Sequence, residues 1–264
     1  MKNPIRWVVL ILGLAGVAAI VYYHWFRQEP ELLPQPPAPA EAKPAPETKA
    51  EPKIQYPIAE SSEAKPLPAL SESDAAVQKA LAGPVGQKAF ADFFYLDGII
   101  QRIVATVDNL PREKVSQRLM PVKPVAGKFL VTGEEDNLVL NPANYLRYAP
   151  YVKLAEAVNV KQLVAVYVYF YPLFQQAYKD LGYPSGYFND RLVQVIDHLL
   201  AAPDVQEPVK LVQPSVMYQF ADHELEALSA GQKIMVRMGA KNAARIKAKL
   251  KEYRRELISQ EFKQ

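Results

Sequence analysis

The sequence predicts a mainly α-helical protein, with an N-terminal transmembrane helix, a disordered Pro-rich linker and a mostly helical globular domain that carries a small β-hairpin. Three observations support this architecture. Residues 7–26 contain no Asp, Glu, Lys or Arg, residues 28–70 hold 11 of the 23 prolines, and residues 71–264 carry apolar side chains at mainly helical spacing. The predicted divisions are therefore 1–27, 28–70 and 71–264.

Residues 7–26 are long enough to cross a bilayer as a helix. At about 1.5 Å per residue this segment spans roughly 30 Å, the thickness of the hydrocarbon core. Trp7 lies at one end and a group of aromatic residues ends at Phe26, as expected at membrane interfaces. Because Lys2 and Arg6 precede the span, we expect the N-terminus in the cytoplasm and the rest of the chain outside it.

A cleaved signal peptide is the alternative for this segment, because such peptides also begin with basic residues and an apolar run. No Ala-x-Ala site closes the run, and bulky residues fill positions 22–26, where cleavage requires small ones. We therefore interpret residues 7–26 as an uncleaved anchor that places the protein in a lipid bilayer.

The linker over residues 28–70 has no Gly, one aromatic residue (Tyr56), seven Glu and four Lys. A segment of this composition buries too little apolar surface to offset the entropy lost on ordering. We therefore expect a disordered spacer with polyproline II character between the bilayer and the domain.

Periodicity and turn residues place the first elements of the domain. A short helix is expected from about residue 71 to 82. Apolar residues between positions 93 and 107 recur every three or four positions, which predicts one amphipathic helix over about 87–109. Residues 128–140 have the pattern of a β-hairpin, with Gly133 in the turn.

The second half of the domain is also predicted to be helical. Asn141 is predicted to cap a helix that has Pro142 at its first position and is expected to break near Pro150. Asn159 opens the next helix, which runs to about residue 181 with a kink at Pro172. The residues around 166–171 have strand-like propensity, but apolar positions at helical spacing across the whole segment favour the helix.

Cap residues define the last elements. Asn189 is predicted to cap a helix, and residues 209–213 can form a short strand. Asp222 is predicted to cap the following helix. Two closing helices are then expected over about 224–238 and 240–258.

Three stretches of the domain carry a family resemblance: residues 110–125, 183–203 and 211–239. Together with the anchor and the linker, they resemble an uncharacterised bacterial family of single-pass, membrane-anchored envelope proteins that contain a domain of unknown function. The resemblance covers most of residues 71–264. It implies that the protein lies in the cell inner membrane with its globular domain in the periplasm. It implies no activity, cofactor or functional residue.

Several kinds of chemistry are excluded or weakly supported. The chain has no Cys, which excludes thiol nucleophiles, thiolate metal sites and disulfides. Asp197 and His198 are adjacent and point about 100° apart on a helix, so they do not converge on one metal ion. No catalytic residues, metal site or cofactor are therefore predicted. The formal charge of +3 is too small to indicate nucleic acid as a partner.

The loop from Tyr183 to Arg191 is the best candidate for binding a ligand or partner. The free N–H groups at the start of the following helix can bind an anion, and an Arg can add a fork for a carboxylate. The alternative is a structural turn in which Asn189 caps the helix. The candidate residues are Tyr183, Tyr187, Asn189, Asp190 and Arg191.

The last predicted helix is rich in Lys and Arg, and its apolar stripe leaves these residues on an outer face. This face can contact an anionic surface such as lipid headgroups, although a solvated face is the simpler interpretation. The function predicted from the sequence is non-catalytic binding or scaffolding, with an unknown envelope protein or cell-wall component as the partner. The alternative is an envelope enzyme that acts on a cell-wall or lipid component.

Overall fold

The computed structural model describes residues 53–58, 66–134 and 137–259. These residues belong to one compact unit. The predicted membrane span over residues 7–26 lies outside the described residues. None of the helices within the described ranges combines the length and the apolar character that crossing a bilayer requires.

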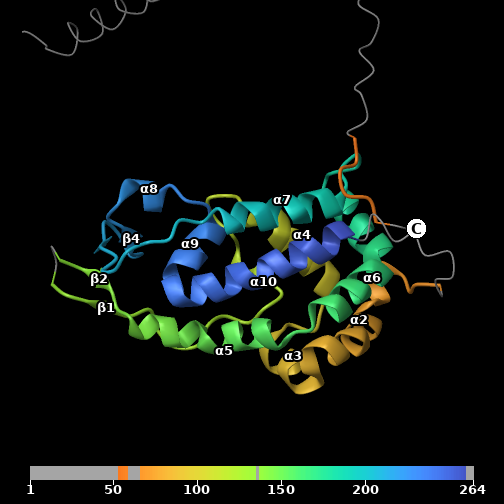
Figure 1. Cartoon of the computed structure of the whole chain (residues 1–264), viewed down its shortest axis with the longest axis horizontal. Coiled ribbons are helices and arrows are strands. Elements are labelled where there is room, and N and C mark those ends of the chain that lie inside the picture. The colour runs from red at the N-terminus through yellow and green to blue at the C-terminus, as the bar shows by residue number, and fades with distance from the viewer. Residues whose placement is uncertain (1–52, 59–65, 135–136, 260–264) are drawn as a thin grey trace, which may run out of the picture. The chain divides into compact units, whose positions relative to one another are not determined.

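Helices dominate the domain, which confirms its predicted fold class (Figure 1). The helix α6 packs against α2, α4 and α10, and α10 also packs against α5 and α7. The helical elements are η1 (Leu70–Glu72), α2 (Asp74–Leu81), η2 (Ala82–Gly86), α3 (Gln87–Phe93), α4 (Ile99–Asn109), η3 (Gln117–Leu119), α5 (Ala143–Ala157), α6 (Val160–Asp180), α7 (Phe188–Leu200), α8 (His223–Glu226), α9 (Ala230–Arg237) and α10 (Ala240–Ile258).

Two short antiparallel hairpins lie together at one end of the domain (Figure 1). The predicted hairpin is confirmed as β1 (Val131–Thr132) paired with β2 (Val139–Leu140). The segment predicted as a possible short strand contributes β3 (Leu211–Val212), which pairs with β4 (Gln219–Phe220). A bridge between Val139 and Lys210 joins the two hairpins, and a small apolar cluster lies beneath them.

The helix α6 supplies much of the main core. It runs unbroken from Val160 to Asp180 and includes Pro172, so helical periodicity prevails over the strand propensity of its middle. Phe170 and Phe174 are 2% and 7% exposed and belong to the same cluster as Ile99 and Ile100 of α4. Burial of this apolar face outweighs the intrinsic preference of the β-branched and aromatic residues.

The predicted single helix over 87–109 is wrong. The structure divides it into α3 and α4, because Phe94 leaves the helix to form a bridge with Val122 and Gly98 adopts a left-handed conformation with a φ of 59°. The Asp74 carboxylate accepts hydrogen bonds from the N–H groups of Gly98 (2.7 Å) and Ile99 (3.0 Å). A side chain from α2 thus starts α4, a contact that periodicity within the segment does not reveal.

The predicted break near Pro150 is also wrong, since α5 continues through this residue from Ala143 to Ala157. A proline inside a helix leaves the carbonyl four residues earlier without its usual donor. That carbonyl belongs to Leu146, whose side chain is 74% exposed. Water can therefore solvate this part of the helix, which makes the proline tolerable.

Parts of the segment assigned to the linker by composition have defined positions on the domain. Ile58 is 7% exposed and belongs to the main core cluster, and Leu67 and Leu70 pack against the same cluster. The predicted domain boundary between Leu70 and Ser71 therefore differs from the structure, in which described residues as early as Lys53 lie within the compact unit. Composition averaged over the whole linker conceals these few apolar residues.

Candidate functional site

The candidate loop connects α6 to α7 through a tight turn. Gly182 takes a φ of 114°, and the N–H of Gly186 donates to the carbonyl of Tyr183 at 3.0 Å. A Cβ atom at Gly186 would lie 2.7 Å from the ring of Tyr178, so this close approach requires glycine. The turn leads directly into Phe188, which is fully buried at the start of α7.

The prediction that Asn189 caps α7 is wrong. The helix begins at Phe188, and the N-cap residue Tyr187 makes no side-chain cap. Instead, the side chain of Gln175 in α6 accepts a hydrogen bond from the N–H of Phe188 at 2.9 Å. Asn189 lies inside the helix with no exposed surface and accepts a hydrogen bond from the Tyr167 hydroxyl at 3.1 Å.

Two tyrosines of α6 next to this loop, Tyr167 and Tyr171, have hydroxyl groups whose protonation is controlled by burial. Burial raises the pKa of Tyr167 and of Tyr171, so both hydroxyls remain protonated and act as donors. Tyr171 donates to the Gln175 side chain at 3.0 Å. These bonds hold Gln175 and Asn189 in the orientations that the start of α7 requires.

The start of α7 binds the main chain of residues 55–58. Asp190 accepts hydrogen bonds from the N–H groups of Gln55 (3.0 Å) and Tyr56 (2.8 Å). The side chain of Asn189 donates to the carbonyl of Tyr56 at 2.8 Å, and the Tyr187 hydroxyl accepts from the N–H of Ile58 at 2.7 Å. We call residues 53–58 the tether segment, and the surface formed by Tyr187, Asn189 and Asp190 the tether groove.

Two side chains of the bound segment add apolar contacts. Ile58 enters the main core, whereas Tyr56 packs against the cluster that includes Leu257 of α10. Residues 53–55 and 57 are exposed. The segment is therefore held mainly by its main-chain hydrogen bonds and by two side chains.

The other two predicted residues gather around Asp108 in α4, whose side chain is 3% exposed. One guanidinium nitrogen of Arg191 lies 3.2 Å from this carboxylate and donates to the carbonyl of the same residue at 2.8 Å. Arg112 donates to the carboxylate at 2.6 Å, and the Tyr183 hydroxyl donates to it at 3.2 Å. The hydrogen bond to Asp108 raises the pKa of Arg112.

The five predicted residues thus belong to two connected arrangements. Tyr187, Asn189 and Asp190 hold the tether segment, whereas Tyr183 and Arg191 hold Asp108. Sequence reasoning missed Asp108, Gln175 and Tyr167. Of these, only Asp108 had a local signal, because Arg112 follows it four residues later and pairs with it across the end of α4.

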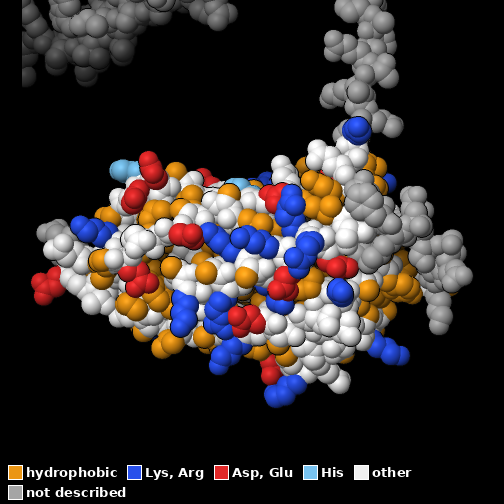
Figure 2. Space-filling view, viewed as in Figure 1, with side chains coloured by type: hydrophobic (Ala, Val, Ile, Leu, Met, Phe, Trp, Pro, Cys, Tyr) orange, Lys and Arg blue, Asp and Glu red, His pale blue; other side chains and the backbone are white. Residues whose placement is uncertain are grey.

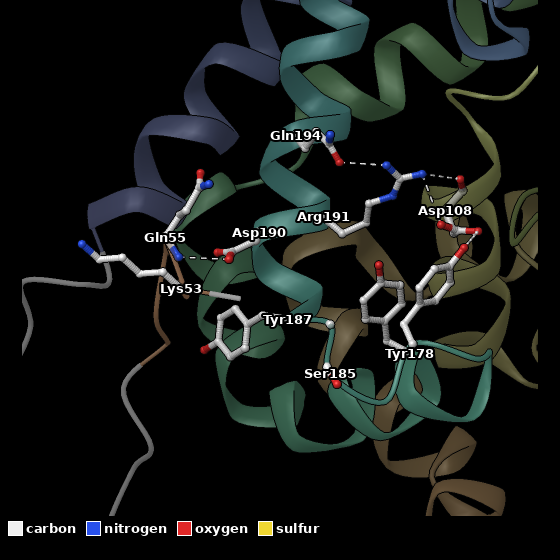
Figure 3. A pocket seen from close by; sticks show the side chains of 11 residues that line it. Lys53, Gln55, Asp108, Tyr178, Ser185, Tyr187, Asp190, Arg191 and Gln194 are labelled. Carbon is white, nitrogen blue, oxygen red and sulfur yellow. Dashed lines mark hydrogen bonds and ion pairs between the residues drawn. The ribbon is translucent and has the colours of Figure 1, made fainter. Parts of the chain in front are cut away.

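An open cleft of about 550 Å³ lies between these two arrangements. In Figure 3, Lys53 and Gln55 of the tether segment form one wall and Tyr178 lies on the opposite side, with Asp190 and Arg191 between them. The side chains of Lys53, Gln55 and Ser185 make no hydrogen bond to any described residue. Both carboxylates of the cleft are already bonded to donors. Of the unused side chains, Lys53 can only donate, whereas Gln55 and Ser185 can donate or accept.

The predicted basic face of the last helix is largely paired with acidic residues. Figure 2 shows Lys and Arg interspersed with Asp and Glu over α10. Four of the seven Lys and Arg residues of α10 form ion pairs, which leaves Lys241, Lys251 and Arg255 without an ion pair among the described residues. The pairs are Arg245–Glu156, Lys247–Asp204, Lys249–Glu252 and Arg254–Asp197.

His198 contacts a serine that sequence reasoning did not connect with it. Its Nε2 atom lies 2.7 Å from Oγ of Ser229. Ser229 is 8% exposed, and its hydroxyl caps α9 by accepting a hydrogen bond from the N–H of Gln232 at 3.2 Å. The hydroxyl can still donate to a neutral imidazole, so the pair forms a structural connection between α7 and α9. The predicted cap of α8 by Asp222 is confirmed.

Burial lowers the pKa of His198 below its ordinary value of 6.5, and the nearby Arg191 adds to this effect. Below pH 6.5 the unfolded chain therefore binds more protons at this residue than the folded chain. The stability that results is fully present above that pH and is lost as the pH falls toward the folded pKa.

We expect the denaturation midpoint of the wild-type protein to fall more between about pH 7 and 5.5 than that of His198→Gln. Urea unfolding at several pH values measures this difference. The exposed His223 provides a control, because His223→Gln should keep the wild-type slope. Equal slopes for wild type and His198→Gln would contradict the prediction.

Among residues 53–58, 66–134 and 137–259, no three His, Asp or Glu side chains gather as a candidate metal site. A family model described as "Protein of unknown function (DUF3014)" matches residues 99–254, which is more than half of the chain. The match includes Asp108, Tyr183 and Arg191 but not the tether segment. No curated protein and no solved structure matches the chain significantly.

Proposed function

The chain belongs to the DUF3014 family of proteins of unknown function, and from this premise we propose that it is a membrane-tethered binding or scaffolding module in the periplasm of the bacterial cell envelope. In this proposal residues 7–26 anchor the chain in the inner membrane. The domain binds an envelope protein or a cell-wall component and catalyses no reaction. Tethering raises the effective concentration of such a module near its partner.

The observation that carries the proposal is the cleft beside the start of α7. Its walls come from the tether segment and from the loop between α6 and α7, so the ligand site adjoins the point at which the tether meets the domain. Unused donors on Lys53, Gln55 and Ser185 favour a ligand rich in acceptors, such as a carboxylate or a carbonyl-rich peptide. The aromatic ring of Tyr178 adds an apolar surface.

The state of the carboxylates favours binding over catalysis. Asp108 is neutralised by two guanidinium groups, and Asp190 accepts two main-chain N–H groups. A general acid or base must contact a reacting group, and both of these carboxylates are already occupied by donors of the protein itself.

Reporter fusions and site-specific crosslinking test the proposal in cells. A C-terminal alkaline phosphatase fusion should be active and a fluorescent-protein fusion dark, because the domain is expected outside the cytoplasm. A photo-crosslinking amino acid at Ser185 or Gln194, which line the cleft, should capture a partner. The same amino acid at Lys153, which is exposed on α5, is the control and should not capture it.

The reporter fusions test the location of the domain, and the crosslinking tests the cleft, so each assignment can be contradicted independently of the other. An inactive phosphatase together with a fluorescent fusion would contradict the periplasmic location. Crosslinks from Lys153 but not from Ser185 or Gln194 would contradict the assignment of the cleft. Co-purification and mass spectrometry of the crosslinked product would then identify the partner and its class.

A further inference from the structure

We propose that the tether groove is a binding site for a short peptide segment of a partner protein, and that residues 55–58 of this chain occupy it in cis. The proposal rests on the binding role proposed above and names the ligand class. It does not depend on where in the cell the domain lies.

The groove recognises main-chain atoms, which all peptides share. Asp190 and Tyr187 accept a hydrogen bond from every N–H group of residues 55–58, since Pro57 has none, and Asn189 donates to the carbonyl of Tyr56. Residues 55 and 56 form a bend, so that two successive N–H groups reach the one carboxylate of Asp190. A partner segment with the same backbone conformation can form the same four hydrogen bonds.

Two side-chain contacts define the preferred sequence. Tyr56 packs against the C-terminal part of α10, and Ile58 is buried in the main core. Pro57 is exposed and restricts the main-chain conformation of the residue before it. The groove therefore suits an aromatic residue, a proline and an aliphatic residue in succession.

The cis segment leaves room for a stronger ligand. Lys53, Ile54 and Gln55 have exposed side chains, and the side chains of Lys53 and Gln55 border the open cleft without hydrogen bonds to described residues. A partner segment that fills this cleft in addition to the groove gains contacts that the cis segment does not make. The same segment of a second copy gains none, because its contacts are identical. This difference favours a partner protein as the occupant.

The proposal predicts competition between the cis segment and a peptide in trans. A tethered segment meets its site at an effective concentration on the order of 1 mM, so a free peptide binds the wild-type chain weakly. The probe is the peptide acetyl-Lys-Ile-Gln-Tyr-Pro-Ile-amide with a fluorophore, and fluorescence anisotropy measures its binding to the purified full-length chain.

The receptor with an empty groove is the full-length chain with Gln55→Gly, Tyr56→Ser, Pro57→Gly and Ile58→Ser. We expect it to bind the peptide at least about 10-fold more tightly than the wild-type chain does, because the competing segment is gone. Adding Asp190→Ala should weaken binding by at least about 10-fold, since two charge-assisted hydrogen bonds are lost. Adding Asp180→Ala is the matched control, because this exposed carboxylate lies outside the groove, and it should change nothing.

Circular dichroism must show wild-type helix content for each variant. The variant with Tyr56→Ser alone keeps Ile58 in the main core, so it disturbs folding less than the fourfold variant. It should bind the peptide with an affinity between those of the wild-type chain and the fourfold variant. The absence of saturable binding below about 1 mM peptide would overturn the proposal, as would equal binding by the Asp190→Ala and Asp180→Ala variants.

Light scattering of the full-length chain tests whether the segment that binds the tether groove in trans comes from a partner protein or from a second copy of this chain. A size that is independent of concentration supports the partner assignment. A concentration-dependent dimer that Asp190→Ala abolishes would overturn it in favour of a second copy. These measurements use purified protein, so their failure is distinct from a failure of the localisation reporters.

Discussion

Replacement of Phe188 by Ala is expected to lower the free energy of unfolding by about 3–5 kcal/mol. The side chain has no exposed surface and lies against three rings of α6. Its ring centroid is 5.8 Å from that of Phe174, with the two planes nearly parallel, and 5.5 Å from that of Tyr178. Removing the ring leaves a cavity that rigid neighbouring helices fill only in part.

Denaturant unfolding of the full-length protein measures this loss. Leu146→Ala is the control, because Leu146 is 74% exposed and its truncation should change the stability by no more than about 0.5 kcal/mol. A loss below about 1 kcal/mol for Phe188→Ala would show that Phe188 is not a packed core residue. Because Asn189 and Asp190 follow directly, we also expect this variant to weaken the contacts of the tether groove.

Replacement of Asp108 by Asn is expected to cost about 2–4 kcal/mol, somewhat less than the loss of one partner from a fully buried ion pair. The substitution leaves Arg191 without its counter-charge, and the Nε atom of Arg191 is already buried without a hydrogen-bond partner. The side chain of Arg191 retains 22% exposure, so water can solvate part of the freed charge. Arg112 is 54% exposed and should contribute little to the loss.

A second substitution separates charge from packing. In the Asp108→Asn background, Arg191→Gln removes the unpaired charge and should recover at least about 1 kcal/mol. The exposed pair of Asp197 with Arg254 is the control, since Asp197→Asn should cost less than about 1 kcal/mol. If the losses at Asp108 and Asp197 were equal, the buried pair would have no special role in stability.

Local signals predicted the caps that depend on neighbours in the chain. Asn159 accepts a hydrogen bond from the N–H of Gln162, as its position before the apolar pattern indicated, and Asp222 caps α8 in the same way. Both bonds span two or three residues, so their geometry follows once the helix begins. Asn189 is also an Asn before an apolar pattern, like Asn159. Its side chain does not cap α7 but accepts a hydrogen bond from Tyr167 of α6.

The residue types of the candidate loop predict binding, and only the structure shows what those residues contact. The aromatic and charged residues of 183–191 are all engaged, but their partners are as far away in the chain as Asp108 and Tyr56. Contacts over such separations depend on how α4, α6 and α7 pack. Sequence periodicity states which face of each helix is apolar but not which helix it meets.

The sequence alone determined that the domain is mainly helical, that α6 is a helix despite its strand-like residues, and that a hairpin follows Lys128. These features depend on periodicity and turn residues, which act within a few positions. Only the tertiary structure decided that residues 55–58 lie in the tether groove, that α4 begins at Asp74's contact with Gly98, and that Asp108 binds Arg191. Each of these contacts joins segments at least 24 residues apart. They form because burial of Ile58, Ile99 and Phe188 brings the segments together. Polar side chains then pair with the main-chain groups and charges that this packing removes from water.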